Sequence, residues 1–266
     1  MMAGDLNLTD THCHLILAEF DDDREMVIGR AEQQGVQKML VPGIDLQTSR
    51  QAVELAGQYE SIHAAVGIHP HMAADWNESV EKELLQLVQA DKVVAIGEIG
   101  LDYYRDFSPR RVQMEAFEAQ LALAHKTDLP VIVHQRESLE DVLDRATKWS
   151  GSLDPARPRP PGVLHAFSGL LDQGIEAIRA GFFLGVAGPV TFKNAQVRRD
   201  ITINLPMESL LLETDSPYLS PHPYRGKRNE PHQAQIIAEK LADMLNMRLA
   251  DVANATHKNA TVCFGW

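Results

Sequence analysis

Short apolar runs of three to six residues recur along the chain, and longer segments with a mixed apolar and polar pattern separate them. Most of the runs are continuously apolar instead of alternating, which is typical of parallel strands covered on both faces. Eight runs have this character: residues 8–12, 38–42, 63–68, 93–96, 130–133, 162–164, 182–186 and 210–212. The pattern predicts eight parallel strands.

The segments between these runs have the features of helices. Residues 112–126 place Phe117 and Leu121 at helical spacing, which indicates an apolar face that packs on the core. The acidic run at 21–25 suits the first turn of a helix, where negative charge meets the positive end of the helix dipole. Gly35 is expected to end that helix. Strands that alternate with helices predict repeated β/α units.

Eight β/α units in about 250 residues have the dimensions of a (β/α)8 TIM barrel. We therefore expect a single α/β barrel domain over residues 1–266. The competing fold is a doubly wound open sheet, but a Gly-rich phosphate loop does not follow the first predicted strand. The proline-rich stretch at 148–162 is interpreted as a surface loop inserted before the sixth strand.

Charge and composition narrow the function classes. The formal net charge of −12 argues against a protein that coats nucleic acid by general attraction, since phosphate binding needs clustered Lys and Arg. The same charge leaves room for an enzyme that holds one phosphodiester against metal ions, because net charge does not describe a single cleft.

Localisation is expected to be cytoplasmic. Two cysteines are too few for a disulfide framework, and the stretch MMAGDLNLTD lacks the basic and apolar regions of a signal peptide. Without a run of 18 apolar residues we expect no contact with a membrane, and the sequence gives no sign of an obligate protein partner.

Two histidines stand one residue apart in TDTHCHL, where the first predicted strand ends. Residues i and i+2 of an extended chain face the same way, so His12 and His14 would project together and could chelate a transition metal. The alternative is a pair of exposed histidines near the amino terminus, and the motif alone does not separate the two.

Further polar residues follow the carboxyl ends of other predicted strands, the face where barrel enzymes place their chemistry. These residues are His69, Glu98, His134, His165 and Asp215. Each has a structural explanation by itself: a core histidine, an ion pair with a neighbouring arginine, or a helix N-cap. Their common position on one rim favours a metal site, and histidine with carboxylate suits zinc, manganese or a related divalent ion better than calcium.

Six blocks of the sequence resemble the signatures of the TatD family of metal-dependent deoxyribonucleases, which are amidohydrolase-like TIM barrels. The blocks are THCHL, GIHPH, IGEIGLDYY, VIVHQRE, HAFSG and LLLETDSPYLSPHPYRGKRNEP. The resemblance implies six ligands for two divalent ions: His12 and His14 with Asp215, His134 with His165, and Glu98 between the ions.

Glu98 and Asp215 are the expected catalytic carboxylates, with Asp215 holding the attacking water and accepting its proton. The resemblance also implies that His69 faces the substrate phosphate. Two departures from the family pattern are expected to alter the substrate groove. Gln135 stands where the family often has a small residue, and the loop at 148–162 is unusually long.

Cations and aromatic residues near these positions suggest substrate contacts. Arg225, Lys227 and Arg228 gather in HPYRGKRNEP after the eighth predicted strand, and Arg136 follows His134. Arginine suits a phosphate backbone because of its bidentate geometry. The alternative for the loop is a solubilising surface.

Tyr103, Tyr104 and Phe107 follow the fourth predicted strand and are candidates for stacking on bases. The alternative is that these rings pack on the barrel rim.

Three functions remain open. The first is hydrolysis of DNA phosphodiester bonds by metal-activated water, on single strands or at ends, with 3′–5′ exonuclease character implied by the resemblance alone. The second is a small-molecule amidohydrolase or esterase acting on a C–N or ester bond, because such ligand sets serve both chemistries and the negative charge favours it. The third is a barrel retained for binding, against which the intact set of six ligands argues.

Overall fold

A computed structural model describes residues 6–266. The first five residues of the expected domain and of the amino-terminal stretch lie outside the described residues. Eight parallel strands form one sheet in the order of the chain. They are β1 (Leu8–Asp10), β2 (Val36–Pro42), β3 (Ile62–Val66), β4 (Val93–Asp102), β5 (Val131–Arg136), β6 (Gly162–Leu164), β7 (Phe183–Val186) and β8 (Leu210–Leu212). The predicted α/β barrel is confirmed.

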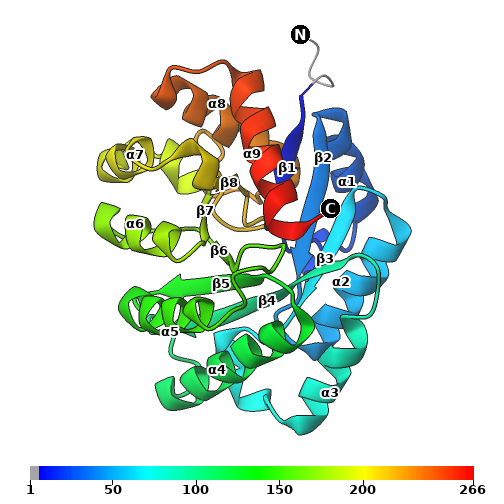
Figure 1. Ribbon diagram of the computed structural model, residues 1–266. Coiled ribbons are helices and arrows are strands. Elements are labelled where there is room, and N and C mark those ends of the chain that lie inside the picture. The colour runs from blue at the N-terminus through cyan, green and yellow to red at the C-terminus, as the bar shows by residue number, and fades with distance from the viewer. Residues whose placement is uncertain (1–5) are drawn as a thin grey trace.

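Helices alternate with the strands and surround the barrel (Figure 1). They are α1 (Arg24–Gln33), α2 (Leu46–Gln58), α3 (Glu78–Leu87), α4 (Arg110–Thr127), α5 (Leu139–Gly151), α6 (Leu171–Arg179), α7 (Gln196–Ile203), α8 (Ala234–Leu245) and α9 (Leu249–Phe264). The predictions for α1 and α4 are confirmed: α1 begins beside the acidic run, and Gly35 follows its end with a φ of 86°.

The barrel closes where the segments after β1 and β8 meet. The amide of Thr11 donates to the carbonyl of Leu212 at 3.0 Å, and the amide of Asp215 donates to the carbonyl of His12 at 2.8 Å. Cys13 and Ser216 form an isolated parallel bridge further along. This closure brings the two ends of the sequence signature, residues 12–14 and 213–215, into contact.

The alternating direction of strand side chains creates two apolar layers. In β2, Met39 and Val41 join the layer between strands and helices, whereas Leu40 joins the cluster inside the barrel. Phe264, with Cys263 of α9, packs against this inner cluster. In Figure 1 α9, drawn in red, crosses in front of the strands, so the carboxyl-terminal helix covers the end of the barrel that faces the viewer.

β4 is longer than predicted, because the buried run continues past Ile96 through Glu98 to Asp102. The register with β5 shifts between Ile96 and Ile99. Gly97 allows the close approach at this shift, since a Cβ there would lie 2.6 Å from the Cβ of Ile132. The extension carries Glu98 into the barrel and Asp102 to its rim.

Two expectations for the proline-rich stretch at 148–162 are wrong. α5 continues to Gly151, so the loop is shorter than the sequence suggested. The remaining loop leads into the start of β6, and its Arg157 pairs with Asp128 before the start of β5. It therefore lies at the amino-terminal end of the barrel and does not shape a groove at the opposite rim.

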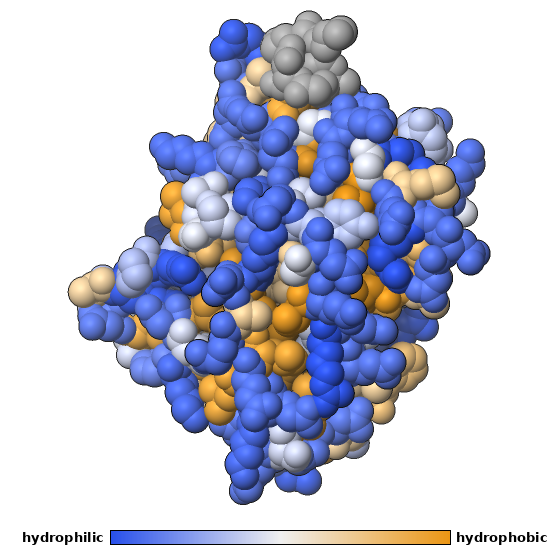
Figure 2. All heavy atoms as spheres, turned by 90° about the vertical axis from the view of Figure 1, so that its right-hand side faces the viewer, coloured by the Kyte–Doolittle hydropathy of each residue, from blue (hydrophilic) through white to orange (hydrophobic). Residues whose placement is uncertain are grey.

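Among the helices of residues 6–266, none combines the length and the apolar character needed to cross a membrane. Figure 2 shows the side of the molecule that carries α1 and α2, where polar side chains surround smaller apolar patches. Such a mixture is ordinary for a protein surface.

Candidate active site

His12 and His14 follow β1 and are buried, with their Nε2 atoms 3.1 Å apart. Asp10 fixes the backbone that carries them. Its carboxylate accepts from the amide of His12 at 3.3 Å and from the amide and hydroxyl of Thr214 at 2.8 and 2.5 Å. Burial raises the pKa of Asp10 to about 8. Asp10 therefore ties the strand that carries the histidine pair to the segment that carries Asp215.

Two carboxylates face the histidine pair. Oε2 of Glu98 lies 3.3 Å from Nε2 of His12 and 3.6 Å from Nε2 of His14. Oδ1 of Asp215 lies 3.8 and 3.4 Å from the same two nitrogens. The Glu98 side chain is 3% exposed and that of Asp215 is 14% exposed, so Asp215 is the more accessible of the two.

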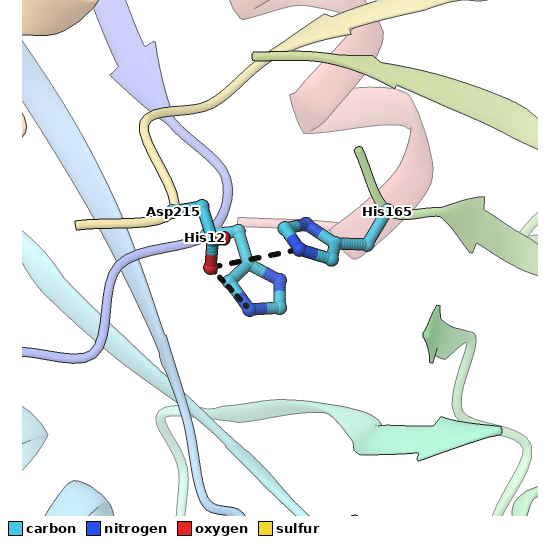
Figure 3. A group of neighbouring side chains, drawn as sticks. All are labelled: His12, His165 and Asp215. Atoms are coloured by element: carbon cyan, nitrogen blue, oxygen red, sulfur yellow. Dashed lines mark ion pairs between the residues drawn. The ribbon is translucent and has the colours of Figure 1, made fainter. Parts of the chain in front are cut away.

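His165 approaches the same carboxylate from β6, as Figure 3 shows for His12, His165 and Asp215. Its Nε2 lies 3.6 Å from Oδ1 of Asp215, and its ring stacks on that of His12 at 3.6 Å between centroids. On the far side its Nδ1 lies 2.9 Å from the buried carboxylate of Glu213. A Cβ at Gly185 would overlap that carboxylate, so a glycine there leaves room for Glu213.

His134 is held between two carboxylates at the end of β5. Its Nδ1 lies 2.7 Å from Oε1 of Glu98, and its Nε2 lies 3.3 Å from Oδ2 of Asp102. The same Oδ2 lies 2.8 Å from Nε2 of His71. Asp102 therefore orients His134 and connects it to a second histidine on the rim.

His69 has a defined tautomer. Its Nδ1 accepts from the amide of His71 at 3.2 Å, and burial holds its pKa well below the ordinary 6.5, so the ring is neutral with its proton on Nε2. That Nε2 lies 3.7 Å from Oε1 of Glu98. The geometry makes His69 a hydrogen-bond donor toward the centre of the site.

The carboxylates favour positive charge at this point of the barrel. Burial lowers the pKa of His134, but hydrogen bonds to Asp102 and Glu98 outweigh it and raise this pKa to about 9. Burial also opposes protonation of His165, yet Glu213 and Asp215 raise its pKa to about 10. The site therefore stabilises protons or cations on its histidines.

The donor set fits divalent cations. An ion held by nitrogen and oxygen at about 2.1 Å separates neighbouring ligand atoms by roughly 3.0–3.4 Å. The Nε2 atoms of His12 and His14 lie 3.1 Å apart, and each lies 3.3–3.8 Å from an oxygen of Glu98 and from an oxygen of Asp215. A single hydrogen bond can join the Nε2 atoms of His12 and His14, with one nitrogen as donor and the other as acceptor. A cation could instead accept the lone pairs of both nitrogens.

Three groups of residues each bring their ligand atoms within 4.8 Å of one another. The groups are His12, His165 and Asp215; His12, His14 and Glu98; and His69, Glu98 and His134. Glu98 belongs to two of these groups, and so does His12. His134 and His165 fall in different groups, unlike the second-ion pair that the resemblance implies. His69, expected to face phosphate, joins the group of His134.

The cations expected to bind substrate have different environments. Arg136 is exposed, with its guanidinium 3.9 Å from the centre of the Tyr104 ring. Arg225 and Lys227 are exposed beside Phe192 and Tyr224. These positions leave all three cations accessible to a ligand.

Arg228 is engaged within the protein, which corrects its expected substrate contact. Its Nη atoms donate to both oxygens of Asp23 at 2.8 and 2.7 Å, to Glu230 at 2.9 Å and to the carbonyl of Glu19 at 2.6 Å. Asp23 lies about two hundred positions away in the chain, so the loop sequence gives no sign of this pairing. Arg228 anchors the loop after β8 to the start of α1.

Replacing Arg228 by Ala is expected to lower the free energy of unfolding by about 2 kcal/mol, because it removes several charge-assisted hydrogen bonds. The hydrogen bond from Arg228 also lowers the pKa of Asp23, so this stabilisation is present above pH 4 and is lost as pH falls through the lowered pKa. Urea unfolding at pH 7 measures the loss. Lys227→Ala, which removes an exposed cation from the same loop, serves as control, and equal stability of the two variants would contradict the anchor.

Gln135 is buried beside His134. Its amide nitrogen donates to the carbonyl of Ala166 and to the hydroxyl of Ser168, both at 3.3 Å. It lines a cavity of about 410 Å³ with Ser168 and Leu170. Gln135 therefore connects the loops after β5 and β6, and its effect on the substrate groove stays a prediction.

Four residues of the site were not found from the sequence: Asp10, His71, Asp102 and Glu213. His71, Asp102 and Glu213 lie inside blocks quoted above, and Asp10 directly precedes one. A polar residue at a strand end is itself a signal. Their roles depend on which loops meet in space, however, and the sequence pattern does not contain that pairing.

Comparisons with known proteins identify the family of this chain. A family model described as TatD related DNase matches residues 9–265. The metal-dependent hydrolase YabD of Bacillus subtilis (strain 168) is 40% identical over 257 residues, covering 97% of this chain and 98% of YabD. The 3′-5′ ssDNA/RNA exonuclease TatD of Escherichia coli (strain K12) is 34% identical over 261 residues, covering 96% and 98%.

A solved structure also matches over its full length. The crystal structure of YjjV, a TatD homolog from Escherichia coli K12, superposes with a TM-score of 0.91 and 33% identity, and covers 100% of both chains. The match spans every strand that carries a residue of the site. The chain belongs to the TatD-related DNase family and is a TatD-type metal-dependent hydrolase.

Proposed function

We propose that this protein is a deoxyribonuclease that releases nucleotides from the 3′ end of single-stranded DNA. The observation that carries the proposal is the convergence of imidazole and carboxylate donors from β1, β4, β5, β6 and the segment after β8 at one end of the barrel. The relative TatD of Escherichia coli, named a 3′-5′ ssDNA/RNA exonuclease, supports the substrate and the direction.

Six residues are proposed to hold two divalent ions, magnesium, manganese or zinc: His12, His14, Glu98, His134, His165 and Asp215. Such ions acidify water and neutralise the charge that develops on a phosphodiester. Glu98 is grouped with His12 and His14 on one side and with His69 and His134 on the other, and it is the proposed shared ligand. Asp102 and Glu213 keep His134 and His165 oriented.

Asp215 is the proposed proton acceptor. Its carboxylate is more exposed than that of Glu98, so a water molecule can reach it. Burial would raise the pKa of Asp215, but His165, with His14 and His12, outweighs burial and lowers it. The group is therefore ionised at neutral pH and able to orient a water and take its proton.

The substrate phosphate would be held by neutral and charged donors. His69 points the Nε2–H established above toward the centre of the site, and a phosphate oxygen is a suitable acceptor. Arg136, Arg225 and Lys227 lie exposed and would attract the phosphate backbone. A reducing, cytoplasmic setting is also proposed, because both cysteines are free and buried.

Release of labelled nucleotides tests the proposal. Single- and double-stranded DNA labelled at either end would be incubated with the protein and Mg²⁺, Mn²⁺ or Zn²⁺. We expect stepwise shortening of 5′-labelled single strands. Absence of release with every ion would favour the alternative, a small-molecule hydrolase acting on a C–N or ester bond, which the same donor set could serve.

Divalent ions are also expected to stabilise the fold, because they bind the folded chain and not the unfolded one. Thermal unfolding after chelation and dialysis would be followed while Mn²⁺ or Zn²⁺ is added. A ligand at a hundred times its dissociation constant contributes about 2.7 kcal/mol. The melting temperature should rise with ion concentration in the unsubstituted protein and much less in His12→Ala. An equal rise in both would contradict the ligand assignment.

A further inference from the structure

The loop between β4 and α4 presents exposed aromatic rings on the catalytic rim. Tyr104 is 54% exposed and Phe107 is 67% exposed. Tyr103 differs, because its hydroxyl donates to Asp141 at 2.7 Å and its ring packs against the core. Packing on the barrel therefore accounts for Tyr103 but leaves Tyr104 and Phe107 unexplained.

A row of rings leads from the candidate metal centre to Phe107. The ring of His69 lies 4.5 Å from that of His134, His71 lies 4.3 Å from His69, and Phe107 lies 4.8 Å from His71, all between centroids. If His69 holds one part of a ligand, an aromatic group in the neighbouring part of that ligand could therefore reach Phe107.

Cations accompany these rings. The guanidinium of Arg136 lies 3.9 Å from the centre of the Tyr104 ring, and that of Arg105 lies 5.7 Å from it. Aromatic rings beside arginine are the composition of surfaces that bind single-stranded nucleic acid without sequence preference.

The loop is held in place by residues beneath it. Oδ1 of Asp102 accepts from the amides of Tyr104 and Arg105 at 2.9 and 2.8 Å. The amide nitrogen of Gln113 donates to the carbonyl of Ser108 at 2.7 Å, and the hydroxyl of Ser108 donates to the carbonyl of His71 at 3.0 Å. A loop fixed in this way loses little conformational entropy when a ligand binds.

We propose that Tyr104 and Phe107 form a base-stacking platform for unpaired nucleobases next to the phosphodiester that is cleaved. The inference rests on the proposed nuclease function and adds the part of the substrate that is recognised. Stacking on a ring face is possible only for a base that has left a duplex, and every base offers such a face. The base-stacking platform therefore selects single strands and tolerates any sequence.

The test compares the unsubstituted protein with the Tyr104→Ala/Phe107→Ala double variant on two 5′-labelled substrates. One is oligothymidylate, and the other is the same strand with abasic tetrahydrofuran residues at its 3′ end. On oligothymidylate we expect the variant to raise KM about ten-fold or more, with kcat nearly unchanged. On the abasic strand the two proteins should have equal KM, because the partner of the rings is already absent.

Met26→Ala, which removes a side chain 60% exposed on α1, is the matched control and should behave as the unsubstituted protein. Thermal unfolding of the double variant should be unchanged, because both rings are exposed. Equal effects of the variant on both substrates, or no effect on either, would overturn the base-stacking platform while the nuclease function stands. Failure of the unsubstituted protein to shorten either strand would instead contradict the nuclease function, and the platform with it.

Discussion

Glu98→Gln is expected to lower nucleotide release by more than about a hundred-fold. Replacing residues that only support a metal ligand typically costs ten- to a hundred-fold, and Glu98 lies directly against two groups of candidate ligands. The amide keeps the shape of the side chain but loses its charge, so the histidines around it no longer face an anion. Metal content after dialysis, measured by elemental analysis, should fall together with the rate.

The matched control for this variant is Glu25→Gln, an exposed carboxylate on α1. It should retain metal and activity. Circular dichroism should show the same fold in both variants, because glutamine fits the volume of glutamate. Activity within a few-fold of the unsubstituted protein in Glu98→Gln would refute the assignment of this residue.

Asp215→Asn is expected to lower kcat by about a hundred- to ten-thousand-fold, the usual contribution of a general base. Asparagine retains an oxygen that can face a cation, but it cannot accept a proton from water. KM for DNA should therefore change little, and the variant should keep more metal than Glu98→Gln. Single-turnover kinetics with 5′-labelled single strands would separate the two parameters.

Asp243→Asn, an exposed carboxylate on α8, is the control for Asp215→Asn. If Asp215→Asn loses metal as completely as Glu98→Gln, loss of a metal ligand is sufficient to explain the lower kcat, and the role as base loses its support. Unchanged kcat would exclude both roles. The two variants together therefore separate the effect of losing metal from the effect of losing the proton acceptor.

The barrel could be predicted because its strands are continuous apolar runs. All eight predicted strands exist, and β6 and β8 have the predicted bounds. The predicted fourth strand ends at Ile96 because Gly97 and Glu98 interrupt the apolar pattern, although both residues are buried within β4. The sequence pattern records polarity, and it misses a polar residue that is buried because its partners come from other strands.

The site was predictable where position along the strand was enough. His12, His14, Glu98 and Asp215 come together because each lies in or just after a strand of a closed parallel barrel. Arg228 shows the limit, because its partner Asp23 is distant in the chain and the contact depends on how α1 meets the loop after β8.

The packing of Cys263 and Phe264 of α9 against the apolar cluster inside the barrel limits the routes by which a substrate can enter. Because α9 closes one end of the barrel and apolar side chains fill its interior, a polymer cannot pass through the barrel. In the proposed nuclease, DNA would have to enter and the released nucleotide would have to leave at the same end of the barrel. The product would then have to leave before the shortened strand binds again, and this order of events would favour dissociation of the strand after each cleavage.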